Sequence, residues 1–245
     1  MAEQNIPNID PQTKKINREY NMVSVTAAFK SIRFWQYLTM MFGANIFLTF
    51  FSYEYKPYGL AHDIEDSFLT WAGSFSSLTQ VLARFTVGSL YDYLGFRIIY
   101  FVLMVINIAN SVICYPAVSI PWLYFLCIQL NYFVIGGVFS LFPAPATNTF
   151  GDDNGVRIYA LILYSSVIAS GFDTLLVNLL YDKIHLQGLI WIGTGFNIAI
   201  ILVNFMFRER LDIERLDAKG LIKWGKLNPQ FLQSATRVSS ADQYK

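Results

Sequence analysis

The chain has 245 residues, of which 54% are hydrophobic, 17% aromatic and only 14% charged. Soluble domains carry about 25% charged residues, so this composition argues against a soluble protein and favours one that lies largely in lipid. The formal net charge of +1 also argues against a nucleic-acid partner, which would call for a strongly basic surface.

The N-terminal segment, residues 1–33, is polar and precedes the first apolar stretch. Its first part contains the acids Glu3, Asp10 and Glu19 and lacks the apolar core of a signal peptide. Insertion into the membrane is therefore expected to depend on the apolar stretches that follow, in the segment 34–207.

Six apolar stretches in this segment approach the length of about 20 residues that a helix needs to cross a bilayer. Each is predicted to be a helix, because lipid cannot satisfy free backbone groups and the stretches are too long for barrel strands. The third and fourth are joined by a tight turn between Pro116 and Pro121 and should form a hairpin. In chain order the predicted spans are residues 34–53, 68–90, 98–118, 122–142, 158–181 and 189–207.

The positions of Lys and Arg predict the orientation of these spans. Of the 18 basic residues, only Lys56 and Lys183 lie in the loops opposite the N-terminus, and Arg84 lies within a span. The others lie on the N-terminal side, and basic residues collect on the inner side of membrane proteins. Both termini are therefore predicted to lie inside. The C-terminal segment 208–245 is expected to be an amphipathic tail that lies on the inner membrane surface or docks onto a partner protein.

The end of the second span and the turn into the third carry the most informative motif, ARFTVGSLYDYLGFR. Gly88 is expected to permit a close approach of helices, and Gly95 a tight turn. Asp92 and Arg97 should place opposite charges at the membrane surface. The spacing G-x-x-x-D-x-x-G-x-R that these four residues form resembles the cytoplasmic loop signature of the major facilitator superfamily. In that family the loop lies between the second and third helices of each six-helix half, and it acts as a gating loop.

Two further stretches resemble one branch of that superfamily, the oxalate/formate antiporters and monocarboxylate transporters. GGVFSLFPAPATNTFGDDNGVRIY, which begins at Gly136, is similar to the segment that joins the tenth and eleventh helices of the branch. SIRFWQYLTMMF, which begins at Ser31, is similar to its seventh helix. The resemblance covers residues 30–210. It implies an all-α membrane protein, a six-transmembrane-helix bundle that forms the C-terminal half of a twelve-helix fold with both termini on the same side.

Arg84 is the residue expected to bind a substrate. A charge in the middle of a span costs about 2.5–3.5 kcal/mol and normally faces a polar cavity or a partner. In the monocarboxylate branch an arginine in this helix, within the same A-R pattern, is implicated in binding the substrate carboxylate, and the planar guanidinium suits that task. Alternatively, Arg84 extends to the inner surface and binds no substrate. The branch has an aspartate one turn earlier, where this chain has Gln80, which lacks the charge but can hydrogen-bond the guanidinium or a ligand.

Three more polar side chains within the spans are candidates for the same site. Asn45 and Asn131 lie on spans that line the cavity in the superfamily, so the resemblance implies substrate contact, while hydrogen bonding between helices is the alternative. Asp173 is the only acid well inside a span. It is either a protonatable coupling group, a cap for a local kink beside Gly171, or the partner of a helix outside this chain.

Enzyme chemistry finds no support in the sequence, which has no dinucleotide or phosphate-binding loop and no Ser-His-Asp order. Cys114 and Cys127 both lie in apolar runs, and no metal-ligand spacing is present. We therefore expect no enzyme activity, no cofactor and no metal.

The resemblance implies a half-transporter for a small organic anion such as a monocarboxylate. One six-helix bundle supplies half of a cavity, so the expected partners besides the lipid bilayer are a second six-helix half, a second copy or a larger membrane complex. One alternative is a transport-inactive, transporter-derived structural subunit of such a complex, and another is an independent six-helix channel or scaffold. The chain is expected to be a multi-pass integral protein, with the plasma membrane and the mitochondrial inner membrane as candidate locations.

Overall fold

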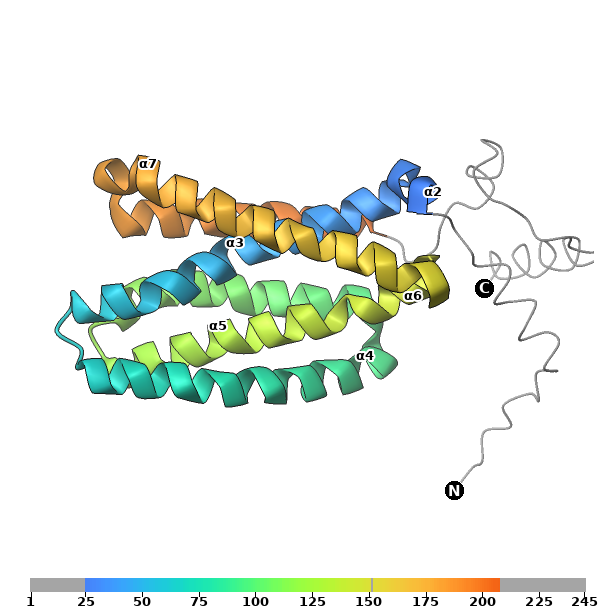
Figure 1. Ribbon diagram of the computed structural model, residues 1–245. Helices are drawn as coiled ribbons and strands as arrows, with labels where there is room; N and C mark the ends of the chain where they lie inside the picture. The colour runs from blue at the N-terminus through green and yellow to red at the C-terminus, as the bar shows by residue number, and fades with distance from the viewer. Residues whose placement is uncertain (1–24, 151, 208–245) are drawn as a thin grey trace, which may run out of the picture.

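The computed structural model describes residues 25–150 and 152–207, and within these ranges nearly every residue is helical and no strand occurs. Figure 1 shows an elongated bundle whose long helices run side by side. The prediction of an all-α protein is thus confirmed for the described residues, whereas the predicted C-terminal tail lies outside them. The helices are α2 (Val25–Lys30), α3 (Ile32–Leu60), α4 (Asp66–Ala117), α5 (Pro121–Leu141), α6 (Pro143–Phe150) and α7 (Asp152–Met206).

Helix α4 consists of two arms that meet at Gly95. A straight helix of its 52 residues would be about 78 Å long, far more than the roughly 30 Å of a bilayer's hydrocarbon core. Gly95 has a φ of 74° and a ψ of 168°, a combination that is open essentially only to glycine. The backbone therefore turns where the sequence predicts a turn, and the arms 66–94 and 96–117 run in opposite directions (Figure 1).

Four helical segments are long and apolar enough to cross a membrane: Asp66–Ala117, Pro121–Phe150, Asn154–Tyr181 and Gln187–Met206. The chain is therefore consistent with a multi-pass integral membrane protein. Helix α3 has 29 residues, enough to span, but it is not among the four, since polar residues such as Gln36, Asn45 and Thr49 lie along it.

Helix α3 lies in the centre of the bundle, packed mainly against α7 and also against α5 and α4. Between Met40 and Phe51 every residue is buried except Phe42 and Thr49, which are partly buried. At one end of α3 the ring of Tyr37 contacts four other aromatic rings, with centroids 4.8–6.2 Å apart. The hydroxyl of Tyr37 also lies 3.1 Å from the hydroxyl of Thr149, which fastens α6 to α3. The four rings belong to Phe96, Phe142, Phe150 and Phe207.

Polar side chains join the second arm of α4 to the last part of α7. Such bonds hold membrane helices together where apolar contacts alone give little preference for one partner over lipid. The donor–acceptor pairs are Thr194 Oγ1 to Ser111 Oγ at 2.8 Å, Asn107 Nδ2 to Asn197 Oδ1 at 3.1 Å, and Asn204 Nδ2 to the carbonyl of Arg97 at 3.1 Å.

Candidate functional site

The first arm of α4 contacts the rest of the bundle along one narrow side, which α5 covers. At the closest point the carbonyl oxygen of Gln80 lies 2.6 Å from the position that a Cβ on Gly136 would take. A glycine at this position is therefore what allows the two helices to approach. The buried residues of the arm are Leu69, Ala72, Ser76, Ala83 and Val87.

A second side of this arm is exposed and apolar, and we call it the apolar face. At about 100° per residue its members share one side of the helix, and their exposed fractions run from 48% to 75%. Large apolar side chains at such exposure on a membrane-crossing helix are suited to contact with lipid. The apolar face consists of Trp71, Phe75, Leu78, Leu82 and Phe85.

A third side of the arm is polar, and all its members except the half-buried Gln80 are exposed. We call it the polar face. It lies between the buried side and the apolar face and contains one exposed apolar side chain, that of Val81. The helix therefore presents one mainly polar and one mainly apolar exposed surface. Lipid does not favour a run of polar groups, and such a surface requires a water-filled cavity or another protein. The polar face consists of Thr70, Ser74, Ser77, Gln80, Arg84 and Gly88.

Arg84 is the charged group at the middle of the polar face. Its side chain makes no hydrogen bond or ion pair with the described residues, and it is exposed. The guanidinium is near enough for its charge to act on the hydroxyl of Tyr159 in α7. That hydroxyl donates to the carbonyl of Phe139 in α5 at 3.1 Å. Arg84 and Gln80 are thus brought together, one turn apart, on a surface that α5 and α7 border.

Asn45 and Asn131 lie elsewhere, fully buried between helices. The Nδ2 of Asn45 donates to Ser166 Oγ of α7 at 3.2 Å. The Nδ2 of Asn131 donates to Ser52 Oγ of α3 at 3.0 Å. The structure therefore engages both amide nitrogens in bonds between helices and gives neither side chain an exposed surface beside Arg84.

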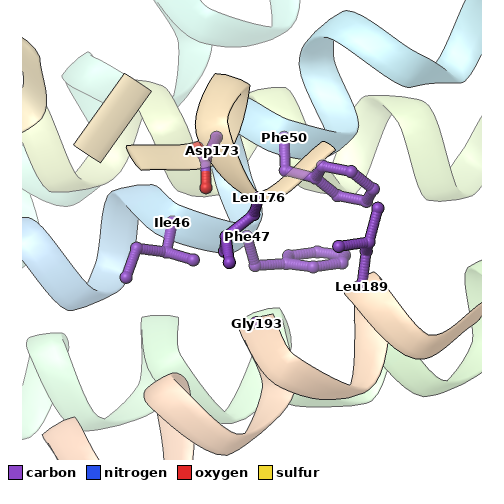
Figure 2. Close-up of a pocket in the computed structure, with 7 residues that line it drawn as sticks. All are labelled: Ile46, Phe47, Phe50, Asp173, Leu176, Leu189 and Gly193. Atoms are coloured by element: carbon purple, nitrogen blue, oxygen red, sulfur yellow. The ribbon is translucent and has the colours of Figure 1, made fainter. Parts of the chain in front are cut away.

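Asp173 is only 4% exposed and accepts a hydrogen bond from the hydroxyl of Thr49 in α3. On one side it borders a narrow apolar pocket, and Figure 2 shows the rings of Phe47 and Phe50 extending from α3 toward Leu189 in that pocket. On the other side Asp173 borders a more open pocket with a volume of about 150 Å³.

The open pocket beside Asp173 contains polar groups that the sequence reading did not connect with it. Its lining includes Glu54, Thr174 and Asn178. Glu54 lies directly after the predicted first span, so the sequence places it at a membrane edge and gives no signal that it shares a pocket with an acid from α7.

The four residues predicted to form a gating loop lie at and around the turn at Gly95, and Gly88 differs from its expected place. Gly88 was expected to sit at a close helix approach, whereas no described atom of another helix lies within 4 Å of its Cβ position. The reason is that Gly88 belongs to the polar face, which points away from α5. Asp92 and Arg97 are both exposed. Arg97 donates to the carbonyl of Phe205 at 2.9 Å, tying the turn at Gly95 to the end of α7.

Within the described residues, no three His, Cys, Asp or Glu side chains lie together in a way that could hold a metal ion. Cys114 and Cys127 are free thiols and both are buried. The exposed guanidinium of Arg84 has the planar pair of donors that matches a carboxylate.

Comparisons with known proteins leave the family open. No protein-family model matches the chain. No curated protein is significantly similar to it. The resemblance to the major facilitator superfamily therefore rests on the motifs, and the case for function rests on the polar face.

Proposed function

We propose that this chain is one six-helix half of a major-facilitator-type transporter that carries a small organic anion such as a monocarboxylate. The observation that supports this most is the pair of exposed surfaces on the first arm of α4. One surface is apolar and suited to lipid, whereas the other is polar and carries Arg84 without a partner among the described residues.

Arg84 is the anion-binding group in this proposal. A guanidinium stays charged at any physiological pH and offers two parallel N–H donors to a carboxylate. Gln80, one turn away on the same face, adds a neutral donor. Because an aspartate is absent at position 80, the positive charge of Arg84 is not neutralised by its own helix and is free to attract an anion.

A second membrane bundle completes the cavity. Most of the polar face, including Arg84 and Gly88, is exposed in the described chain. Lys56 Nζ donates to Thr70 Oγ1 at one end of this face, and lipid is a poor cover for the other polar groups. Helix α4 has two arms, and α7 contains two segments that are each long enough to cross a membrane. Together with α3 and α5 they support six membrane crossings. In Figure 1, α2 and the end of α7 lie at the same end of the bundle, which supports termini on one side. Transport then follows from movement of the two bundles around a central site.

A transport-inactive structural subunit is the alternative. The burial of Asn45 and Asn131 favours it, because these two predicted substrate contacts serve helix packing and leave Arg84 and Gln80 as the remaining predicted ones. In that case a neighbouring subunit, rather than water and substrate, would cover the polar face.

The two functions are separated by purifying the full chain in a mild detergent with every chain that accompanies it. After identification by mass, the complex is reconstituted into vesicles and the uptake of a labelled monocarboxylate is measured. We expect Arg84→Gln to lower uptake at least tenfold, in line with the loss of a charged hydrogen-bond partner. Arg84→Lys, which keeps the charge but loses the planar fork, should retain part of the uptake.

The control is Lys183→Gln, which removes an exposed cation from α7 and lies outside the polar face. We expect this variant to transport like the wild type. A large stable assembly with no uptake, whose integrity is the same with Arg84→Gln, would reject the transporter and support the structural subunit.

A further inference from the structure

An aromatic groove lies at the end of the bundle opposite α6, where the first arm of α4 and α5 both begin (Figure 1). Its volume is about 340 Å³, and two indole rings stand at its surface, with exposed fractions of 75% for Trp71 and 71% for Trp122. The aromatic groove is lined by Glu65, Ser67, Phe68, Trp71, Phe75, Trp122 and Phe125.

Four of the five rings of the aromatic groove form one connected group across the two helices, and the exposed ring of Trp71 lines the groove beside them. The ring of Phe68 meets that of Trp122 edge-on at 5.4 Å, and the ring of Phe125 lies 5.9–6.2 Å from those of Phe68, Phe75 and Trp122. Aromatic faces attract cations, and the indole does so most strongly. The groove therefore suits a cation with an apolar surface.

A carboxylate stands beside these rings without a positive partner. Glu65 precedes the first turn of α4, and its side chain makes no capping bond to that helix. The neighbouring Asp66 is paired with Lys56 at 2.9 Å, whereas Glu65 has no ion pair with any described residue. The aromatic groove thus carries one uncompensated negative charge.

Apolar side chains continue from the groove along both helices. On α4 the exposed Leu78 and Leu82 follow Trp71 on the apolar face. On α5 the exposed Leu126 and Leu130 follow Trp122 at intervals of four residues and share its side of the helix. The helices thus present aromatic rings and a carboxylate at their ends, followed by a row of apolar side chains. A lipid has the matching order, a cationic headgroup followed by acyl chains.

We propose that the aromatic groove binds a choline phospholipid. The quaternary ammonium lies over the rings beside Glu65, and an acyl chain lies along the leucines of α4 and α5. A quaternary ammonium has no N–H to donate, so ring faces are the groups that select it, and the carboxylate adds attraction of opposite charge. This inference does not depend on the proposed transport.

The test is native mass spectrometry of the purified full chain with phosphatidylcholine, phosphatidylethanolamine and phosphatidylglycerol that share the same acyl chains. We expect phosphatidylcholine to be retained in preference to both others. Trp71→Leu should lower its retention about two- to fivefold, the range for an exposed cation–π contact. Glu65→Gln should lower it by up to about fivefold, the range for an exposed ion pair. Both side chains are exposed, so neither change threatens the fold, and Trp71→Phe should retain more than Trp71→Leu.

Matched controls test the charge and the ring separately. Asp63→Asn removes a nearby exposed acid that does not line the groove, and its φ of 61° is one that asparagine tolerates. Trp191→Leu removes an exposed indole from α7. Both controls should retain phosphatidylcholine like the wild type. Equal retention of the three lipids, or an equal loss with the controls, would overturn the proposal and leave an ordinary interfacial belt of aromatic residues.

Discussion

Single polar side chains hold α3 in place between its neighbours. Thr49 bonds Asp173 and Asn45 bonds Ser166, so two links one turn apart on α3 join it to α7. Hydrogen bonds between membrane helices contribute about 0.6 kcal/mol on average and up to about 2 kcal/mol. The bond to Asp173 should be at the upper end, because it serves a buried carboxyl group.

Thr49→Val tests this link. Valine has nearly the shape of threonine but no hydroxyl, so an oxygen of Asp173 loses its donor in a buried position. We expect the free energy of unfolding to fall by about 1–3 kcal/mol, measured by thermal unfolding of the purified chain. Thr174→Val is the control, since that exposed hydroxyl bonds only the carbonyl of Ser170 in its own helix. Equal stability of the two variants would show that the bond to Asp173 contributes little.

The sequence predicted the residue-scale site in part. Gln80 and Arg84 share a face because four residues make about one helical turn, which spacing alone predicts. The partnership of Asp173 with Thr49 joins residues 124 positions apart and follows from how α3 packs on α7, which spacing does not determine. The burial of Asn45 and Asn131 depends on the same packing.

At the scale of elements, replacing either of two glycines with alanine should affect stability differently. Gly136 lies on α5 where it faces α4, whereas Gly88 lies on an open side of α4. Gly136→Ala places a methyl group 2.6 Å from a backbone oxygen of α4, so we expect a loss of about 1–3 kcal/mol of stability. Gly88→Ala meets no described atom and should leave the stability of the isolated chain equal or raise it by up to about 1 kcal/mol through helix propensity.

Thermal unfolding of both variants in the same detergent gives the comparison. A destabilised Gly88→Ala variant in the isolated chain would contradict the position of Gly88 on an open face. If Gly88→Ala is stable but no longer retains the chain's membrane partner, the second bundle docks at that glycine.

The ends of helices were predictable where a glycine or a proline determines the backbone conformation. The turn at Gly95 and the short link before Pro121 are at the predicted positions, because glycine opens an otherwise forbidden conformation and proline favours a first helical turn. Helix α6 was not predicted. The predicted fourth span ends at residue 142, directly before Pro143, but proline is also tolerated as the first residue of a helix, and α6 begins there.

At the scale of the whole molecule, the proposed function depends on which surfaces of α4 face lipid and which face water. The apolar face and most of the polar face of α4 are exposed in the described chain, so exposure alone does not distinguish them. Their chemistry does, because only one of them is suited to lipid. The distinction links the proposed six-helix half, its proposed partner bundle and the proposed anion-binding role of Arg84.

The most direct test compares thiol labelling at two adjacent positions in the native membrane, Ser77→Cys on the polar face and Leu78→Cys on the apolar face. A water-soluble maleimide reacts with the thiolate, which forms in water and not in lipid, and the native Cys114 and Cys127 are buried. The account predicts rapid labelling at position 77, slowed by a monocarboxylate, and little labelling at position 78. Unreactive Ser77→Cys, or equal labelling at both positions, would contradict a water-filled cavity beside Arg84.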